Sequence, residues 1–319
     1  MGPYEEYIDE LERRSRLFPA SRALYEKLAH LADPRKTFPW ARSIIVCARR
    51  YNHYRIPPGL DGYFGKLYLF DGRLPYSKEY SFALSFESFL KEIGLVSARA
   101  EVPLRLAAVR AGLGRSGKNN FIYTKFGSWV WLDAWVTDGE LQCDQPLKDP
   151  VACPKTCTKC IDACPTGALA APFTMDRGTC IAHLSFSLNR LPPEHLREKM
   201  GTWLYGCDVC QDVCPMNADK WSEDGDFPGL SDLALRITPE HIFKLDEESF
   251  RKVVQPRFWY IKEDDLWIWR CNALRAMANS HRKQYQELIL AACTHPDEKV
   301  RQMGLWACEK VSRSAQTAP

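Results

Sequence analysis

The sequence predicts a mixed α+β protein, and three observations carry this prediction. Apolar runs rich in β-branched or aromatic residues, which are typical of strands, occur as SIIVCA (43–48) and FGSWVWLDAWVTDGEL (126–141). Segments with apolar residues at helical spacing lie between these runs and again towards the C-terminus. A cysteine-rich segment with little room for regular structure separates the two parts. We therefore expect an α/β, a cysteine-rich and a helical region in this order.

Helix-stop, turn and proline residues suggest limits for these regions. The helical segment 80–95 meets a glycine stop signal, and the second strand runs into an Asp-Gly turn. We expect an α/β domain at 1–148, a cysteine-rich domain at 149–220 after a proline-containing break, and a helical domain at 221–319. In the last domain a helix restarts at Asp297 after a proline. This helix pair resembles a HEAT-type repeat, and a plain helical hairpin explains the same letters.

Composition sets limits on location and partners. The 319 residues are 45% hydrophobic and carry a net charge of +3, so overall charge gives no argument for nucleic-acid binding. No apolar run approaches the roughly 20 residues that span a bilayer. The N-terminal segment is charged and lacks the apolar core of a signal peptide. We expect a cytoplasmic protein, monomeric and without a membrane partner.

Thirteen cysteines are the most informative feature of the composition. Because the cytosol keeps thiols reduced, metal ligation is a better explanation than a disulfide framework. Eight of them lie between Cys153 and Cys214. The other five are predicted to be small buried hydrophobic residues: Cys47, Cys143, Cys271, Cys293 and Cys308.

The eight clustered cysteines form a repeated motif. The pattern C-x2-C-x3-C-P occurs from Cys157 and again from Cys207, with Cys153 and Cys180 outside it. Its repetition is typical of two [4Fe–4S] clusters, whereas a zinc site, the alternative, does not need the Cys-Pro ending twice. Because each Cys-Pro ligand serves the opposite cluster in such proteins, the ligands interleave. The predicted sets are Cys153, Cys157, Cys160 and Cys214 for one cluster, and Cys164, Cys180, Cys207 and Cys210 for the other.

A glycine-rich stretch, AVRAGLGRSGKNNF, contains Gly112, Gly114 and Gly117 in the spacing G-x-G-x-x-G. A dinucleotide site needs a strand before these glycines and a helix after them, but here the order is reversed. A phosphate-binding P-loop also needs Ser or Thr where Asn119 stands. The remaining interpretations are a tight turn and, preferred here, glycines that let the backbone approach a large flat ligand.

Three cysteine segments resemble epoxyqueuosine reductases in order and spacing: CTKCIDACPTGAL, CIAHLSFSLN and YGCDVCQDVCPMN. The segment RAGLGRSGKNNFIYTKFGSWVWLDAWVTD is similar to the glycine-rich segment of that family and its following strand. The resemblance implies a nitroreductase-like α/β domain that binds base-off cobalamin, and a ferredoxin-like double-cluster domain. It also implies electron flow from an external donor such as a flavodoxin or ferredoxin, and reduction of epoxyqueuosine in tRNA to queuosine.

The family's functional positions can be transferred residue by residue. Besides the three glycines, the cobalamin contacts implied by the resemblance are Ile122, Leu132, Ala182, Cys207 and Asp208. A gapless alignment places Ala98 where the family has an aspartate proton donor. Glu101 is the nearest acid, and Tyr51 and Tyr54 are the alternative donors, since the related reductive dehalogenases use a tyrosine.

The missing aspartate keeps two other functions open. One is a related cobalamin and iron–sulfur reductase acting on a small molecule such as an organohalide. The other is a two-cluster electron-transfer protein without a corrinoid. If tRNA is the substrate, the candidate phosphate contacts lie near the C-terminal helices: Arg270, Arg275, Arg282, Lys283 and Arg301.

Overall fold

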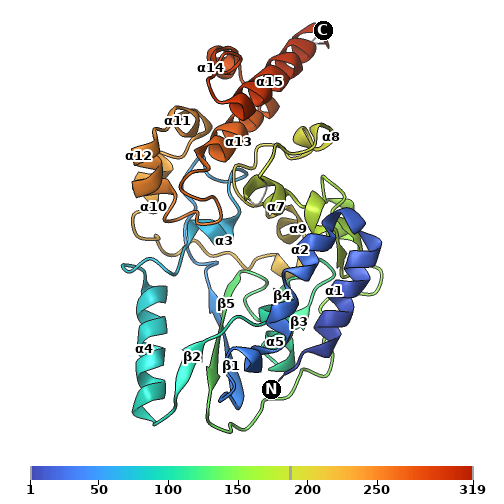
Figure 1. Cartoon of the computed structure of the whole chain (residues 1–319), viewed down its shortest axis with the longest axis vertical. Coiled ribbons are helices and arrows are strands. Elements are labelled where there is room, and N and C mark those ends of the chain that lie inside the picture. The colour runs from blue at the N-terminus through green and yellow to red at the C-terminus, as the bar shows by residue number, and fades with distance from the viewer. Residues whose placement is uncertain (1, 187–188, 318–319) are drawn as a thin grey trace. The chain divides into compact units, whose positions relative to one another are not determined.

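A computed structural model describes residues 2–186 and 189–317 of the chain (Figure 1). Contacts within the chain group its residues into two compact units. Unit 1 consists of Met1–Tyr54, Gly72–Gly178 and Val209–Gly225, and unit 2 of Arg55–Asp71, Thr179–Asp208 and Asp226–Pro319. Since both units are assembled from separate segments, the three consecutive domains 1–148, 149–220 and 221–319 stay a prediction.

Unit 1 contains all the named strands of the described chain and several helices. The helices are α1 (Glu5–Leu17), α2 (Arg22–Glu26), α4 (Lys78–Glu92), α5 (Leu104–Arg110), α6 (Lys159–Asp162) and α9 (Val209–Asp212). The strands are β1 (Ser43–Arg50), β2 (Ser97–Arg99), β3 (Arg115–Ser116), β4 (Ile122–Tyr123), β5 (Val130–Thr137), β6 (Leu169–Ala171) and β7 (Thr174–Met175).

A three-stranded antiparallel sheet with the order β1-β5-β2 is the centre of unit 1. Its register pairs Ala48 with Leu132 and Ser97 with Thr137. Both strands predicted from apolar runs are confirmed as β1 and β5, and the helix predicted at 80–95 is α4, which ends just before Gly94. Gly94 has a φ of +82°, a value that favours glycine.

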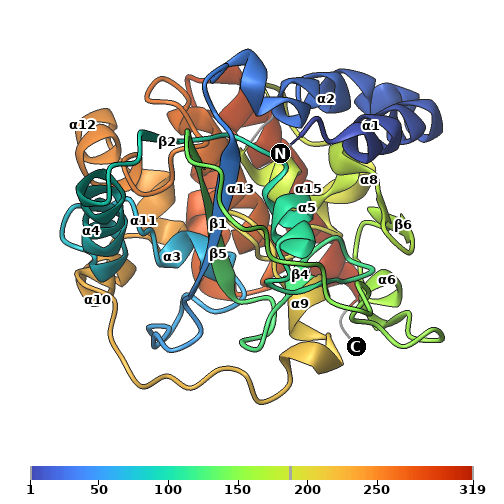
Figure 2. The same cartoon turned by 90° about the horizontal axis from the view of Figure 1, so that it is seen from below.

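The two faces of this sheet are covered by different helices, because successive side chains of a strand point in opposite directions. On one face Ala134 packs with Ala107 of α5 and with Tyr4. On the other face the neighbouring Trp135 packs with Ala83 and Leu90 of α4. Figure 2 shows α4 and α5 on opposite sides of β1 and β5. The alternation of the β5 sequence therefore determines how unit 1 is layered.

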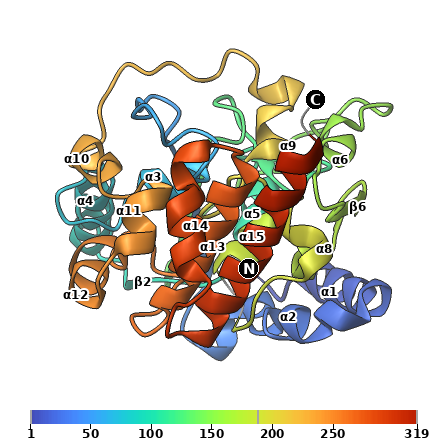
Figure 3. The same ribbon diagram turned by 90° about the horizontal axis from the view of Figure 1, so that it is seen from above.

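Unit 2 is helical in the part that the structure describes. Its helices are α3 (Lys66–Leu69), α7 (Ile181–Phe186), α8 (Glu194–Arg197), α10 (Leu230–Ala234), α11 (Pro239–Lys244), α12 (Glu247–Ser249), α13 (Leu266–Asn279), α14 (Gln286–Ala292) and α15 (Glu298–Thr317). Figure 3 shows α13, α14 and α15 packed side by side. The predicted restart at Asp297 is confirmed, since its Oδ1 accepts a hydrogen bond of 3.0 Å from the Val300 amide.

Arg275 on α13 holds the core of unit 2 together and corrects one prediction. Its side chain is 0% exposed, and its guanidinium donates hydrogen bonds to the carbonyl groups of Gly201 (2.7 Å) and Trp203. Burial lowers the pKa of this guanidinium to about 9. The prediction that Arg275 contacts phosphate is wrong, because the side chain caps backbone carbonyls inside the unit.

The scattered cysteines only partly follow expectation. Cys271 is buried, whereas Cys143 is exposed, so the prediction of burial is wrong for Cys143. Cys293 and Cys308 are half-buried, and their Sγ atoms lie 2.7 Å apart between α14 and α15. No helix among the described residues is long and apolar enough to cross a bilayer.

Candidate functional site

The eight clustered cysteines divide between the two units. Six of them belong to unit 1, and Cys180 and Cys207 belong to unit 2. The predicted first set lies wholly in unit 1, so its surroundings can be compared with the prediction. Burial raises the pKa of the Cys160 thiol, and the neighbouring Cys153, Cys214 and Cys157 raise it further. These three cysteines are the ones with which Cys160 is predicted to share a cluster, and the ligand set itself stays a prediction.

The two copies of the cysteine motif have the same local structure. In each copy a one-turn helix carries the second cysteine, Cys160 in α6 and Cys210 in α9. Each helix ends as the third cysteine amide donates a hydrogen bond of 3.2 Å to the carbonyl three residues earlier, at Cys164 and at Cys214. Proline follows both and stops the helix. The helices α6 and α9 contact each other within unit 1.

Two sulfur atoms of the first set each have a hydrogen-bond donor beside them. The Lys118 amide lies 3.3 Å from Cys153 Sγ, and the Tyr123 hydroxyl bonds to the Cys214 thiol. Burial and this bond raise the pKa of the Tyr123 phenol. Such donors are the usual second layer around cluster sulfurs, so this set fits the chemistry of an iron–sulfur cluster. No group of His, Cys, Asp or Glu among the described residues is arranged to bind a single metal ion.

The glycine-rich stretch lies against these ligands. Helix α5 precedes it and strands β3 and β4 follow it, which confirms the order that argued against a nucleotide site. A Cβ atom at Gly114 would lie 2.6 Å from the carbonyl oxygen of Tyr123, and one at Gly117 would collide with the Tyr123 ring. The β3–β4 hairpin itself therefore requires these glycines. Approach of a flat ligand to this backbone stays a prediction.

The next residues connect the hairpin to other parts of unit 1. The Asn119 side-chain amide donates to the Tyr123 hydroxyl (2.8 Å) and to the carbonyl of Cys210 (2.9 Å). Asn120, with a φ of 66°, accepts a hydrogen bond of 2.7 Å from Arg14 of α1. Asn119 thus attaches the hairpin to α9, and Asn120 attaches it to α1.

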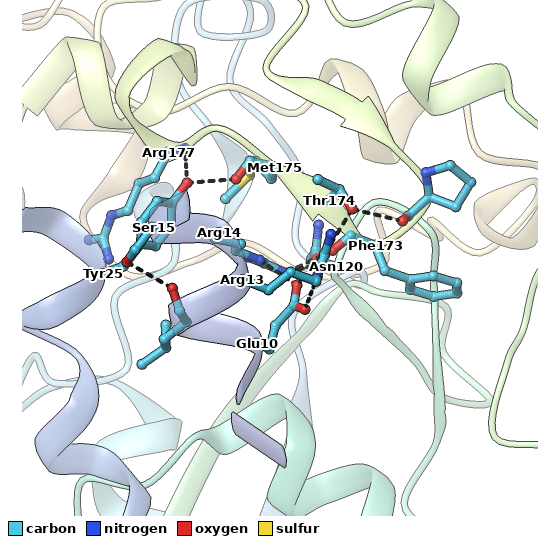
Figure 4. A network of polar contacts seen from close by, with 12 residues as sticks. Glu10, Arg13, Arg14, Ser15, Tyr25, Asn120, Phe173, Thr174, Met175 and Arg177 are labelled. Carbon is cyan, nitrogen blue, oxygen red and sulfur yellow. Dashed lines mark hydrogen bonds and ion pairs between the residues drawn. The ribbon is translucent and has the colours of Figure 1, made fainter. Parts of the chain in front are cut away.

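A polar network shown in Figure 4 attaches α1 and α2 to the β6–β7 hairpin, which lies between Cys164 and Cys180 in the sequence. Arg14 also donates to the Phe173 carbonyl at 2.8 Å, and Arg13 donates to Thr174 Oγ1 at 2.9 Å. The Tyr25 hydroxyl donates to the Met175 carbonyl at 2.8 Å. The N-terminal helices therefore fix the chain that leads out of the first cysteine motif.

A second polar region follows the end of β1 and contains both predicted tyrosine donors. Tyr51 makes edge-to-face contacts with Trp129 and Trp221, whereas the Tyr54 hydroxyl donates a hydrogen bond of 2.6 Å to Glu79 Oε1. Burial and the Glu79 carboxyl group raise the pKa of Tyr54. Sequence reasoning missed Glu79, which lies in the first turn of α4 far from the motifs.

Several buried polar atoms in this region have no hydrogen-bond partner among the residues that the structure describes. The group comprises Arg49 Nη1, Asn52 Oδ1, His53 Nδ1 and Glu79 Oε2. Since nearly all buried polar groups in proteins are hydrogen-bonded, an ordered water or a polar ligand would complete the hydrogen bonds of these atoms. Glu101, in contrast, is 85% exposed and lies 3.4 Å from His30. The burial on which a donor role for Glu101 depends is absent.

Known proteins resemble the chain in the parts that carry this site. A family model described as a 4Fe-4S double cluster binding domain matches residues 153–217, which include all eight clustered cysteines. The epoxyqueuosine reductase of Leadbetterella byssophila is 36% identical over 217 residues, which cover 62% of this chain and 68% of that protein. That of Cyclobacterium marinum is 36% identical over 247 residues, covering 71% and 76%. The chain belongs to the epoxyqueuosine reductase family.

Solved structures of epoxyqueuosine reductases share the fold. One, with an epoxyqueuosine-modified tRNA-Tyr stem loop, is 25% identical with a TM-score of 0.71, and the match covers 99% of this chain and 94% of that one. The Bacillus subtilis enzyme, described with its catalytic aspartate loop swung out of the active site, is 28% identical with a TM-score of 0.69, covering 88% and 76%.

The position of the family aspartate and the predicted cobalamin contacts lie in both units. Ala98, at the place of the epoxyqueuosine reductase aspartate, lies in β2 opposite Val136. Of the predicted cobalamin contacts, Ile122 and Leu132 share an apolar cluster in unit 1 with Ala108 and Val130. The others are in unit 2: Ala182, Cys207 and Asp208. Asp208 is buried there, and its carboxylate accepts a hydrogen bond of 2.6 Å from the Lys66 amide.

Proposed function

We propose that this chain reduces epoxyqueuosine in tRNA to queuosine, with two [4Fe–4S] clusters and base-off cobalamin as cofactors. Membership of the epoxyqueuosine reductase family, with the complete set of eight cysteines, is the observation that carries the proposal. The proposed cell compartment is the cytoplasm, and the proposed electron donor is an external flavodoxin or ferredoxin acting on a monomer.

The reaction removes the epoxide oxygen as water and therefore consumes a pair of electrons and a pair of protons. When bound, cobalamin supplies a strongly reducing metal centre for the electrons that the clusters deliver. The first ligand set of unit 1 would hold one cluster, and the apolar cluster that contains Ile122 and Leu132 would support the backbone proposed to face the corrin ring. The unpartnered groups after β1 offer hydrogen bonds to a polar ligand in the same unit.

The protons require an acid that this chain does not have at Ala98. We propose Glu79 as the donor, with Tyr54 as the residue that positions it. Glu79 is 8% exposed, Tyr54 holds its Oε1, and its Oε2 has no partner in the described part of the chain. A buried carboxyl group that is fixed through one oxygen can carry a proton on the other, which a general acid must do. Among the predicted donors, Glu101 lacks the burial, and the ring of Tyr51 is packed between tryptophans.

For tRNA, the basic residues at the turn after α13 are the best candidates. Arg282 and Lys283 are exposed, whereas Arg270 and Arg301 are half-buried and donate to backbone carbonyls of Leu245 and His295. Phosphate contacts by the exposed pair would add a salt-dependent affinity for any tRNA.

The decisive experiment is a turnover assay under anaerobic conditions. Protein reconstituted with iron, sulfide and cobalamin and then reduced should convert epoxyqueuosine-bearing tRNA to queuosine, measured in nuclease digests by mass spectrometry. Absence of product with all cofactors loaded, together with dehalogenation of an organohalide, would favour the small-molecule reductase. Purified protein that binds iron but no corrinoid would favour a two-cluster electron-transfer protein.

A further inference from the structure

Lys118 follows the glycine-rich stretch at the position of a P-loop lysine, but its surroundings are different. Its side chain is 7% exposed. The Nζ atom donates hydrogen bonds to the carbonyl oxygens of Pro154 (2.9 Å), Lys155 (2.7 Å) and Cys157 (2.8 Å). Since an ammonium group has three donors, all of them are used within the protein. The side chain is therefore not available for a phosphate.

The same residue also contacts the first ligand of the predicted cluster. Its backbone amide lies 3.3 Å from Cys153 Sγ, while its ammonium group holds the carbonyl of Cys157. A single residue thus joins both ends of the loop between two predicted ligands. Its carbonyl in turn accepts a hydrogen bond of 2.8 Å from the Phe173 amide, which fixes the lysine backbone.

The charge of Lys118 is the unexplained part of this arrangement. Neutral carbonyl groups replace the water around a buried ammonium, but they do not neutralise its charge, and an unpaired buried charge is costly. Within the described part of the chain no carboxylate forms an ion pair with Lys118. Four cysteine thiolates outweigh the positive charge of a [4Fe–4S] core, so a cluster bound by Cys153 and its co-ligands is anionic.

We propose that Lys118 positions the Cys153–Cys157 loop for the first cluster and serves as its buried counter-charge, which favours the reduced cluster. The proposal rests on the ligation of that cluster by Cys153, Cys157, Cys160 and Cys214. Reduction adds one electron to the cluster without making or breaking a bond to the protein. Because the added negative charge lies close to a buried positive one, removal of the positive charge makes reduction harder.

The test compares Lys118→Met with Lys155→Met in the full chain. Lys155 lies in the same loop but is exposed, so its replacement removes an equal charge that water already screens. Iron and sulfide content are measured after anaerobic reconstitution. The midpoint potentials of both clusters are then measured by redox titration with dithionite and mediators, followed by electron paramagnetic resonance.

We expect Lys118→Met to shift the reduction equilibrium of one cluster at least tenfold towards the oxidised form, about 59 mV for one electron. The other cluster should not move, and Lys155→Met should change neither cluster more than about threefold. Lys118→Arg, which keeps the charge, should recover most of the shift. Loss of half of the iron in Lys118→Met with the second cluster unchanged would also support the positioning role.

Unchanged iron content and unchanged potentials in Lys118→Met would overturn the proposal. If Lys118→Met fails to fold, Lys118→Arg decides, since a wild-type potential supports the counter-charge and a tenfold shift contradicts it. Wild-type protein without iron would instead contradict the ligation on which the proposal rests. These readouts do not depend on turnover, so they separate the role of Lys118 from the proposed activity on tRNA.

Discussion

Replacement of Glu79 by glutamine tests the proposed proton donor directly. Glutamine has nearly the same shape and still accepts the hydrogen bond from Tyr54, but it has no acidic proton to give. General acids contribute roughly 10² to 10⁴ in rate, which corresponds to about 3 to 5 kcal/mol in the barrier. We expect Glu79→Gln to lower the rate of queuosine formation within this range while stability changes little.

Tyr54→Phe is the complementary change. The Tyr54 hydroxyl donates a buried hydrogen bond of 2.6 Å to Glu79 Oε1, and leaving that oxygen without this donor costs about 1 to 3 kcal/mol. Loss of this bond should lower stability by about that amount and reduce the rate less than Glu79→Gln does. Tyr80→Phe, the same chemical change at the residue beside Glu79, serves as the control.

The assay is single-turnover conversion of epoxyqueuosine-bearing tRNA by reduced protein, with iron and corrinoid content checked in every variant. Glu101→Gln provides the comparison, because that side chain is 85% exposed. A wild-type rate in fully loaded Glu79→Gln would refute the reasoning. A strong loss in Glu101→Gln would return the role to the loop acid predicted from the sequence.

The pH dependence of stability gives an independent check on Tyr54. Burial and the hydrogen bond to Glu79 raise the pKa of the phenol above its ordinary value of 10.0. Above about pH 10 the unfolded chain therefore binds fewer protons at this residue than the native protein does, and stability falls as the pH rises. Urea unfolding at alkaline pH should show a smaller decline in Tyr54→Phe than in wild type.

Three further predictions concern the clusters, the core of unit 2 and tRNA. Cys180→Ala should lower the iron content from about eight to about four per chain and leave one cluster signal intact; two intact signals would contradict the partition. Arg275→Met leaves buried carbonyls without donors and should lower stability by about 3 kcal/mol or more, whereas an unchanged melting temperature would contradict its capping role. Replacement of both Arg282 and Lys283 by alanine should reduce the salt slope of tRNA binding by about two, and an unchanged slope would remove them from the interface.

The parts of the fold that follow from local sequence were predicted well. The strand at 43–48, the helix at 80–95 and the restart at Asp297 each depend on neighbouring residues, and the structure has all of them. The two cysteine sets follow from the spacing of the motifs, and they stay a prediction. Burial was less predictable. Arginine is usually exposed, but the carbonyl groups of residues 200, 201 and 203 accept hydrogen bonds from Arg275 and allow it to be buried.

The residues with proposed roles that the sequence did not predict are joined to their partners across long stretches of chain. Glu79 lies 25 positions from Tyr54, and Lys118 lies 39 positions from Cys157. Arg14 contacts Phe173, 159 positions away. No periodicity or spacing connects such pairs, since their contact depends on how the elements pack. Only Lys118 stands in a conspicuous motif, and that motif resembles a nucleotide site although the order of helix and strand around it argues against one.

The letters G-x-G-x-x-G-K indicate a phosphate site only if their hydrogen-bond donors remain free. In this chain the Lys118 amide lies against Cys153 Sγ, its ammonium group holds three carbonyls, and the Gly117 amide donates to Phe121 at 2.7 Å. The Lys118 donors, which would bind phosphate in a P-loop, are thus directed to a loop that carries cysteine ligands and is anionic once a cluster is bound. The motif retains its preference for negative charge, but the charge comes from within the protein's own cluster. Occupied donors cannot also bind a nucleotide, so added ATP or NADH should leave the cluster spectrum and the melting temperature unchanged.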